Sequence, residues 1–188
     1  MKVVGLAGTN GSGKDTVAEF LKEEYGYYVV SATEMLEAEL SKLDWPTDRT
    51  HKRKLGNQWR REQGLGVIVQ RAVNEAKAAG FDKVVVGSLR NSGEADLVHE
   101  LGGQVLWIDA DPKLRYERVK KGNRGRIEDD KTFREFLSDE QAEMVEDGDR
   151  ATLNMGMVKQ KSDIFLKNNF SSSEKFKKYL EMALTEIA

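Results

Sequence analysis

The feature that most constrains this chain is a glycine-rich segment lying between an apolar run and an amphipathic run. The segment, residues 8–16, reads Gly-Thr-Asn-Gly-Ser-Gly-Lys-Asp-Thr. The apolar residues 3–7 before it predict a strand, and residues 17–21 after it predict a helix. Glycines allow a tight turn with inward-pointing N–H groups, and the helix presents its positive end to the same point. The order of strand, loop and helix therefore predicts a phosphate-binding loop (P-loop).

Within this loop, we expect Lys14 to place a compact positive charge on the outer phosphates of a bound nucleotide. The usual motif has Ser or Thr directly after the lysine, where the hydroxyl reaches Mg²⁺. Here Asp15 holds that position and Thr16 follows, so these two are the candidate metal ligands. The alternative is a glycine-rich turn that binds nothing. The remaining expected nucleotide contacts in the loop are Gly8, Asn10, Gly11, Ser12 and Gly13.

The composition narrows the class of protein. With 188 residues, 39% of them hydrophobic, the chain predicts a single globular domain with a substantial core. A net charge of −2 gives no reason to expect a nucleic-acid or membrane partner. The absence of cysteine excludes disulfides and thiolate chemistry, and two histidines argue against a histidine-rich metal centre. No signal peptide or membrane span is expected, so we predict a cytoplasmic location.

Short apolar runs alternate with helical patterns along the chain. This alternation predicts a three-layer α/β/α fold with a five-stranded parallel sheet, formed by residues 1–188 as one domain. The further predicted strands are residues 27–30, 84–86, 105–108 and 164–166. The predicted helices are residues 14–25, 33–43, 50–79, 92–101, 112–121, 131–147 and 173–187.

Ligands of open α/β sheets bind beyond the carboxyl ends of the strands, so the residues that follow each strand are candidate ligand contacts. Ser31 and Glu34 follow the second strand and are candidates for binding the substrate. Arg90 lies four residues beyond the third strand, where its guanidinium could bind a second phosphate. The alternative for Arg90 is a surface ion pair with Glu94, one helical turn further on.

Two other basic segments are candidates for phosphate or substrate contacts. Residues 120–130 are polar and predict a short mobile lid, whose arginines would neutralise a migrating phosphoryl group. Among Arg115, Arg118, Arg124 and Arg126, the favoured catalytic residues are Arg118 and Arg126; the alternative is a solvated helix end. In the basic and aromatic segment 49–71, we expect Arg60 or Arg61 to bind substrate and the tryptophans to pack in the core.

Four segments resemble P-loop nucleoside monophosphate kinases and related enzymes, a group that includes deoxynucleoside monophosphate, adenylate and dephospho-CoA kinases. Residues 11–16 look like the loop of phage-type deoxynucleoside monophosphate kinases. Residues 30–36, Val-Ser-Ala-Thr-Glu-Met-Leu, are similar to the adenylate-kinase stretch that opens the acceptor-binding part. Residues 84–94 resemble the strand and Asp-Val-Arg segment. Residues 162–168 look like the family's Ala-Asp-hydrophobic-Asn ending, which implies that Asn168 lies near the donor adenine.

The chain also departs from this family. Glu37 replaces the adenylate-kinase arginine, and Ser88 replaces the acidic residue expected after the third strand. The loss of that carboxylate puts the usual Mg²⁺ arrangement in doubt, for which Asp15, Asp109 or Asp111 could compensate. The resemblance implies that residues 33–79 bind the acceptor and residues 120–130 form the lid.

Three functions follow from these patterns. The first is an ATP- and Mg²⁺-dependent kinase that phosphorylates a nucleoside or deoxynucleoside monophosphate, with a small-molecule nucleotide as its partner. The second is a dephospho-CoA kinase-like enzyme that phosphorylates a hydroxyl group and uses a carboxylate as a base. The third is a nucleotide-binding switch without kinase activity, which the missing strand-end acid favours.

Overall fold

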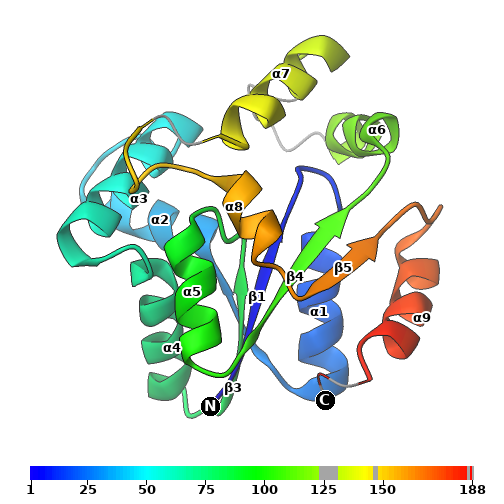
Figure 1. The fold of residues 1–188 in the computed structure, drawn as a ribbon, viewed down its shortest axis with the longest axis horizontal. Helices are drawn as coiled ribbons and strands as arrows, with labels where there is room; N and C mark the ends of the chain where they lie inside the picture. The colour runs from blue at the N-terminus through cyan, green and yellow to red at the C-terminus, as the bar shows by residue number, and fades with distance from the viewer. Residues whose placement is uncertain (123–130, 146–147, 186, 188) are drawn as a thin grey trace.

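The computed structural model describes residues 1–122, 131–145, 148–185 and 187. Its centre is a five-stranded sheet in the order β2-β3-β1-β4-β5, in which every described neighbouring pair is parallel (Figure 1). The predicted fold class is confirmed. The strands are β1 (Lys2–Gly8), β2 (Tyr28–Ser31), β3 (Lys83–Gly87), β4 (Gln104–Asp109) and β5 (Ile164–Lys167).

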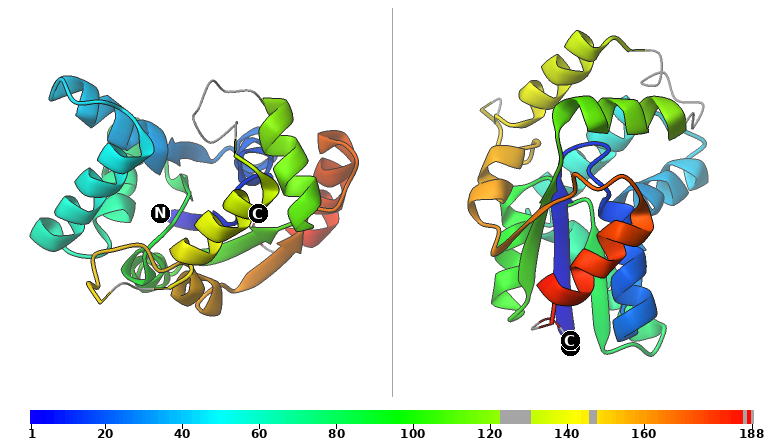
Figure 2. Two further views of the ribbon diagram at one scale, coloured as in Figure 1. Left: turned by 90° about the horizontal axis from the view of Figure 1, so that it is seen from above. Right: turned by 90° about the vertical axis from the view of Figure 1, so that its right-hand side faces the viewer.

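Helices cover both faces of the sheet and also cross its carboxyl edge. On one face α1 and α9 pack together, and on the other lie α4, α5 and α8 (Figure 1). Seen from above in Figure 2, α6 and α7 run across the carboxyl ends of the strands. The helices are α1 (Lys14–Tyr25), α2 (Ala32–Lys42), α3 (Arg49–Gln63), α4 (Val67–Ala78), α5 (Ser92–Glu100), α6 (Pro112–Gly122), α7 (Phe133–Glu143), α8 (Met155–Gln160) and α9 (Ser173–Ala183).

The core is divided by the sheet into two apolar clusters. Alternate residues of β1 enter different clusters: Val3 and Ala7 join one, and Val4 and Leu6 join the other. Because both faces of the strand are covered, β1 is apolar at almost every position, which is why the sequence shows a continuous run rather than an alternation. The glycine-rich loop begins at Gly8, where this buried central strand ends.

The predicted helix 50–79 is wrong as a single element. The structure divides this segment into α3 and α4, which are separated by Gly64, Leu65 and Gly66. Gly64 has φ +100°, a conformation that side-chain-bearing residues rarely adopt, and its N–H caps α3 by donating to the Arg60 carbonyl. The short helix α8, with the Asn154 side chain as its N-cap, was not predicted. Of the predicted lid, residues 123–130, including Arg124 and Arg126, lie outside the described residues.

Candidate active site

The glycine-rich loop connects the end of β1 to the start of α1. Gly13 is the N-cap of α1, with φ +97°, and it makes no side-chain capping hydrogen bond. The first backbone N–H groups of a helix have no partner within the helix. The positive end of α1 therefore faces the loop with backbone donors suited to an anion.

Lys14 lies across this loop. Its Nζ donates to the carbonyl oxygens of Gly8 at 2.9 Å and Thr9 at 2.7 Å. Burial lowers the pKa of Lys14 to about 8, and the positive charge of Arg90 acts in the same direction. A phosphate group placed beside this ammonium would favour its charged form and oppose that shift. The environment of Lys14 is thus electrostatically suited to an anion.

Asn168, which follows β5, binds the main chain of the glycine-rich loop. Its side-chain Nδ2 donates to the Ser12 carbonyl at 2.8 Å, and a Cβ atom at Gly13 would lie only 2.4 Å from that nitrogen. Glycine at position 13 is favoured by its positive φ, and a Cβ there would also displace the Asn168 amide. The buried Ser12 Oγ has no hydrogen-bond partner among the described residues. That hydroxyl fits the donor set of a phosphate site.

Two arginines of α6 connect this helix to the loop. Arg118 donates to the carbonyls of Asn168 at 3.1 Å and Phe170 at 2.9 Å, and at 3.4 Å to that of Gly11. Burial lowers the pKa of Arg118 from its ordinary value. In this arrangement Arg118 braces the predicted phosphate site through main-chain carbonyls.

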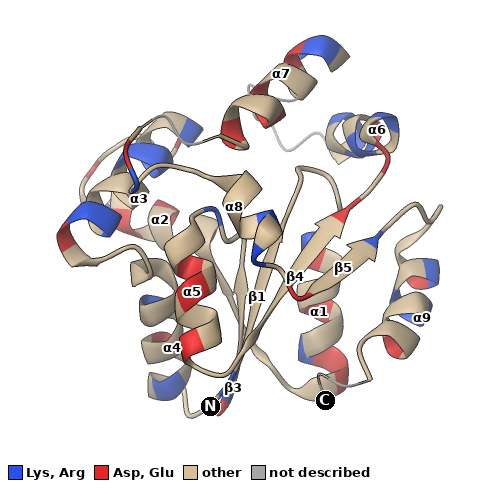
Figure 3. Ribbon diagram, in the orientation of Figure 1, with Lys and Arg blue, Asp and Glu red and all other residues tan. Residues whose placement is uncertain are grey.

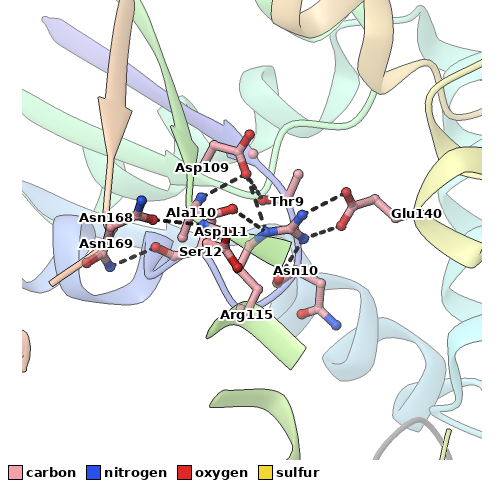
Figure 4. A network of polar contacts seen from close by, with 12 residues as sticks. Thr9, Asn10, Ser12, Asp109, Ala110, Asp111, Arg115, Glu140, Asn168 and Asn169 are labelled. Carbon is pink, nitrogen blue, oxygen red and sulfur yellow. Dashed lines mark hydrogen bonds and ion pairs between the residues drawn. The ribbon is translucent and has the colours of Figure 1, made fainter. Parts of the chain in front are cut away.

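Arg115, which is 2% exposed, is the centre of the network in Figure 4. It donates to the Ala110 carbonyl at 2.9 Å and to Glu140 of α7 at 3.0 Å, and it lies 3.4 Å from Asp109. Asp109 in turn accepts a 2.8 Å hydrogen bond from the Thr9 hydroxyl. The end of β4, the P-loop and α7 are therefore joined through one guanidinium.

Arg90 and Arg49 meet on a single carboxylate. Arg90 donates to Glu143 Oε2 at 2.8 Å, and Arg49 of α3 pairs with Glu143 Oε1. Burial opposes ionisation of Glu143, but the two arginines outweigh it and lower the pKa of this carboxyl. The predicted alternative, an Arg90–Glu94 side-chain pair, is not what forms, since Glu94 instead accepts the backbone N–H of Arg90 at 2.6 Å.

A cavity of about 30 Å³ lies between the P-loop and α7, which is room for roughly one or two water molecules. The P-loop side is formed by Gly8 and Thr9, and Arg49 and Arg90 also border the cavity. Its remaining wall includes Glu140 and Glu143 together with Phe136, Met144, Met155 and Trp107. Basic and acidic side chains from α3, α7 and the loop after β3 therefore converge at the P-loop.

Four predicted substrate-binding residues have other contacts in the structure. Ser31 Oγ caps α2 by accepting the Glu34 N–H at 3.3 Å, and Glu34 itself is exposed. Arg60 forms a buried ion pair with Glu94, with N–O distances of 3.0 and 2.7 Å. Arg61 forms an exposed ion pair with Asp149. None of these four lines the cavity at the P-loop.

The described residues offer few side chains that could bind a metal ion. No group of three or more His, Asp or Glu side chains among the described residues could hold a metal ion. Ser88, which replaces the strand-end acid, has φ +66°. Asp15 is exposed and Thr16 is half-buried at the first turn of α1. Mg²⁺ in nucleotide sites takes most of its ligands from phosphates and water, so one or two protein oxygens are sufficient.

Sequence reasoning missed Glu140 and Glu143, and within the basic segment 49–71 it favoured Arg60 or Arg61 over Arg49. Glu140 and Glu143 are three residues apart on α7, a spacing that places both on one helix face, and this was the available signal. Arg49 is the first residue of α3, behind the Asp48 cap. The ion pairs that these residues form join segments far apart in the chain and have no local pattern.

Comparison with known protein families identifies the group to which the chain belongs. A family model described as an AAA domain (AAA_17) matches residues 7–135, more than half of the chain. The chain belongs to this family. The resemblance to the P-loop nucleoside monophosphate kinase-like group is thereby confirmed at the level of the group.

Two relatives and one solved structure match nearly the whole length of the chain. A UPF0200 protein of Pyrobaculum aerophilum is 26% identical over 189 residues, covering 100% of this chain and 99% of its own length. A UPF0200 protein of Methanosarcina barkeri is 26% identical, with 95% and 91% covered. A shikimate kinase structure from Bacteroides thetaiotaomicron has a TM-score of 0.61 at 12% identity, with 97% of each chain covered. By family and fold, the chain groups with the P-loop kinases.

Among the described residues, every helix falls short of the length and apolar composition that a membrane span requires.

Proposed function

We propose that this family member is an ATP-dependent phosphotransferase that moves the γ-phosphoryl group of ATP to a nucleoside or deoxynucleoside monophosphate. The observation that carries the proposal is the meeting of Arg49 and Arg90 on one carboxylate within the cavity at the P-loop. Two guanidinium groups that hold two carboxylate oxygens are also suited to hold a phosphate group. Acceptor and donor phosphates would then lie side by side.

Each basic residue has a distinct task in this proposal. Bound Mg²⁺-ATP supplies the phosphoryl group, while Lys14 and the amides of α1 hold its phosphate chain. Arg49 and Arg90 orient the acceptor, and Arg90 also stabilises the charge that spreads over the phosphoryl oxygens. Because the acceptor is already a phosphate, no general base is required. Rate enhancement then comes from positioning and charge neutralisation.

The metal would be held by few protein atoms. We assign the Thr16 hydroxyl as the first candidate ligand, with Asp15 beside it and Asp109 at the end of β4. Asp109 lies next to the loop through its hydrogen bond with Thr9. The segment 33–79 contributes Arg49 and is proposed to bind the acceptor. A lid within residues 120–130, with Arg126, remains part of the proposal.

Two other functions have an observation in their favour. A hydroxyl kinase of the dephospho-CoA kinase type is favoured by Glu143, a carboxylate that borders the cavity beside Lys14 and Arg90. A nucleotide-binding switch is favoured by Ser88 at the end of β3, where a carboxylate is usual. Glu143 lies between two arginines that lower its pKa, which makes it a weak base and ranks the hydroxyl kinase second.

The decisive experiment follows ADP formation by the purified protein with Mg²⁺-ATP and a panel of nucleoside monophosphates, dephospho-CoA and shikimate. ADP that depends on a nucleoside monophosphate, and that is lost in Lys14→Ala, is the expected result. Turnover with dephospho-CoA alone would establish the hydroxyl kinase. Nucleotide binding without phosphotransfer to any acceptor would indicate a nucleotide-binding switch without kinase activity.

The pH profile provides a separate prediction. We expect kcat/KM for ATP to fall about tenfold per pH unit above about pH 8, because Lys14 of the free protein loses its charge near that pH. kcat should fall less, since bound phosphates favour the charged ammonium. Initial rates at subsaturating and saturating ATP would measure the two profiles. A kcat/KM profile that stays level well above pH 8 would contradict the assigned role of Lys14.

A further inference from the structure

Helix α7 places acidic side chains on the basic residues of the candidate site. Glu143 binds Arg49 and Arg90, Glu140 binds Arg115, and Asp139, one turn before Glu143, pairs with Lys131. Figure 3 shows acidic residues at the end of α7 nearest the sheet. The carboxylates of α7 thus neutralise the basic groups that border the cavity at the P-loop.

Glu143 is the most enclosed of these acids. Its side chain is 16% exposed, and its two oxygens each contact a different guanidinium, one from α3 and one from the loop after β3. Charge-assisted hydrogen bonds of this kind are about twice as strong as those between neutral groups. The carboxylate therefore occupies the position that the proposed function gives to the anionic group of the acceptor.

The space at the site supports the same conclusion. With α7 in this position, the cavity of about 30 Å³ has room for roughly one or two water molecules. Glu143 already takes one guanidinium nitrogen of each arginine, and its carboxylate would repel a second anion placed there. Glu143 and an acceptor anion therefore compete for Arg49 and Arg90.

We infer that Glu143 is an intramolecular competitor of the acceptor, and that an acceptor with a phosphate or carboxylate group binds by displacing Glu143 from Arg49 and Arg90. This inference rests on the proposed function and adds to it a specificity-determining residue. Glu143 excludes weakly bound anions from the site and admits those with enough other contacts to displace it. The apparent dissociation constant of the ligand is raised, because only the fraction of protein in which Glu143 is displaced can bind it.

The first test is Glu143→Gln, which keeps the shape of the side chain and removes its charge. The matched control is Glu23→Gln on α1, outside the site, which removes one of the two acidic partners of Lys177 in α9. We expect KM for the nucleoside monophosphate to fall about tenfold in Glu143→Gln without loss of kcat, and to stay unchanged in the control. An unchanged or raised KM would overturn the inference. A fall in kcat at constant KM would also overturn it and indicate that Glu143 acts on an acceptor hydroxyl.

A double-mutant cycle adds a signature that a structural role of Glu143 would not produce. Arg49→Met weakens both the competitor and the acceptor, so its effect on KM should be small in the wild type. In the Glu143→Gln background only the acceptor is weakened, and the same substitution should raise KM several-fold more. Equal effects in the two backgrounds would mean that Glu143 and the acceptor do not share Arg49.

The last test uses inorganic phosphate and separates this inference from the proposed function. With the P-loop saturated by a non-hydrolysable ATP analogue, phosphate should bind about tenfold more tightly to Glu143→Gln than to wild type, as measured by calorimetry. Equal phosphate affinities would reject the competition alone. Failure to bind the analogue, or no ADP with any acceptor, would instead count against the proposed function.

Hydrogen exchange tests the inference in the wild-type protein and does not depend on the folding of the variant. Saturating nucleoside monophosphate should speed amide hydrogen exchange in residues 133–143, because displacement of Glu143 releases α7. Unchanged or slower exchange would reject the competition.

Discussion

Replacing Lys14 with methionine is expected to reduce phosphotransfer at least about 10³-fold and to make the ligand-free protein more stable at pH 7. The loss of activity follows from the removal of the cation assigned to the outer phosphates. A single arginine that stabilises a transferring phosphoryl group contributes about 10³–10⁵-fold, and we expect at least the lower end of that range for Lys14. The gain in stability follows from the lowered pKa of Lys14, since the folded protein disfavours the charged form that is present at pH 7. Activity and stability should therefore change in opposite directions.

The stability gained in Lys14→Met is expected to be about 2 kcal/mol at pH 7 and to depend on pH. A pKa lowered from 10.5 to about 8 corresponds to about 3 kcal/mol, and the hydrogen bonds lost to Gly8 and Thr9 reduce the net gain to about 2 kcal/mol. Between about pH 8 and 10.5 Lys14 is more protonated in the unfolded than in the folded wild type, so the contribution of Lys14 to wild-type stability rises with pH. The advantage of Lys14→Met should shrink over that range.

Denaturant unfolding at several pH values, together with the ADP assay, would measure both effects. Lys22→Met is the matched control, because Lys22 lies exposed in the last turn of the same helix. That control should retain activity and lose at most about 1 kcal/mol of stability. Lys14→Met that is less stable than wild type at pH 7 would show that Lys14 has a structural role which outweighs its desolvation.

The second large effect is expected at the buried ion pair between Arg60 and Glu94. Arg60→Met should lower the free energy of unfolding by about 3–5 kcal/mol, because it leaves the Glu94 charge buried without its partner. Both side chains are almost inaccessible, at 5% and 1% exposure. The neighbouring ion pair of Arg61 with Asp149 is exposed, so Arg61→Met should change the same quantity by no more than about 1 kcal/mol.

The double variant Arg60→Met/Glu94→Gln distinguishes the buried charge from lost packing. Glutamine keeps an oxygen that can accept the backbone N–H groups of Arg90 and Asn91, which Glu94 accepts at 2.6 and 3.1 Å, and it carries no charge. Most of the lost stability should therefore return in the double variant. Equal losses in Arg60→Met and Arg61→Met, measured by urea unfolding, would contradict the assignment of a dominant buried ion pair.

Much of the fold could be predicted because its signals are local. The strand before Gly8 and the helix after Gly13 have continuous patterns, and all five strands lie where apolar runs predict them. The helix 50–79 was predicted too long because the apolar spacing continues across Gly64 and Gly66, although the two glycines marked the break. In this segment the apolar periodicity favours one helix, whereas the two glycines favour a break.

The candidate site was predictable only in part. The position of Arg90 follows from the end of β3, but its partner Glu143 lies 53 residues further along the chain. An ion pair of this kind depends on how α7 packs over the sheet, which no short sequence pattern specifies. The same reason explains why Arg60 was assigned to substrate, since a basic side chain on an amphipathic helix does not reveal the buried acid that it meets.

The first strand of the chain is also the middle strand of the sheet, and this has a consequence for how the protein folds. Val3 lies opposite Val84 on one side, and Leu6 lies opposite Leu106 on the other. The loop after β1 therefore acquires its shape only after segments about 80 to 100 residues away have closed on it, a topology that folds slowly. A phosphate ligand, which needs the finished loop, binds after this closure. Its effect should be to slow unfolding and leave the folding rate unchanged.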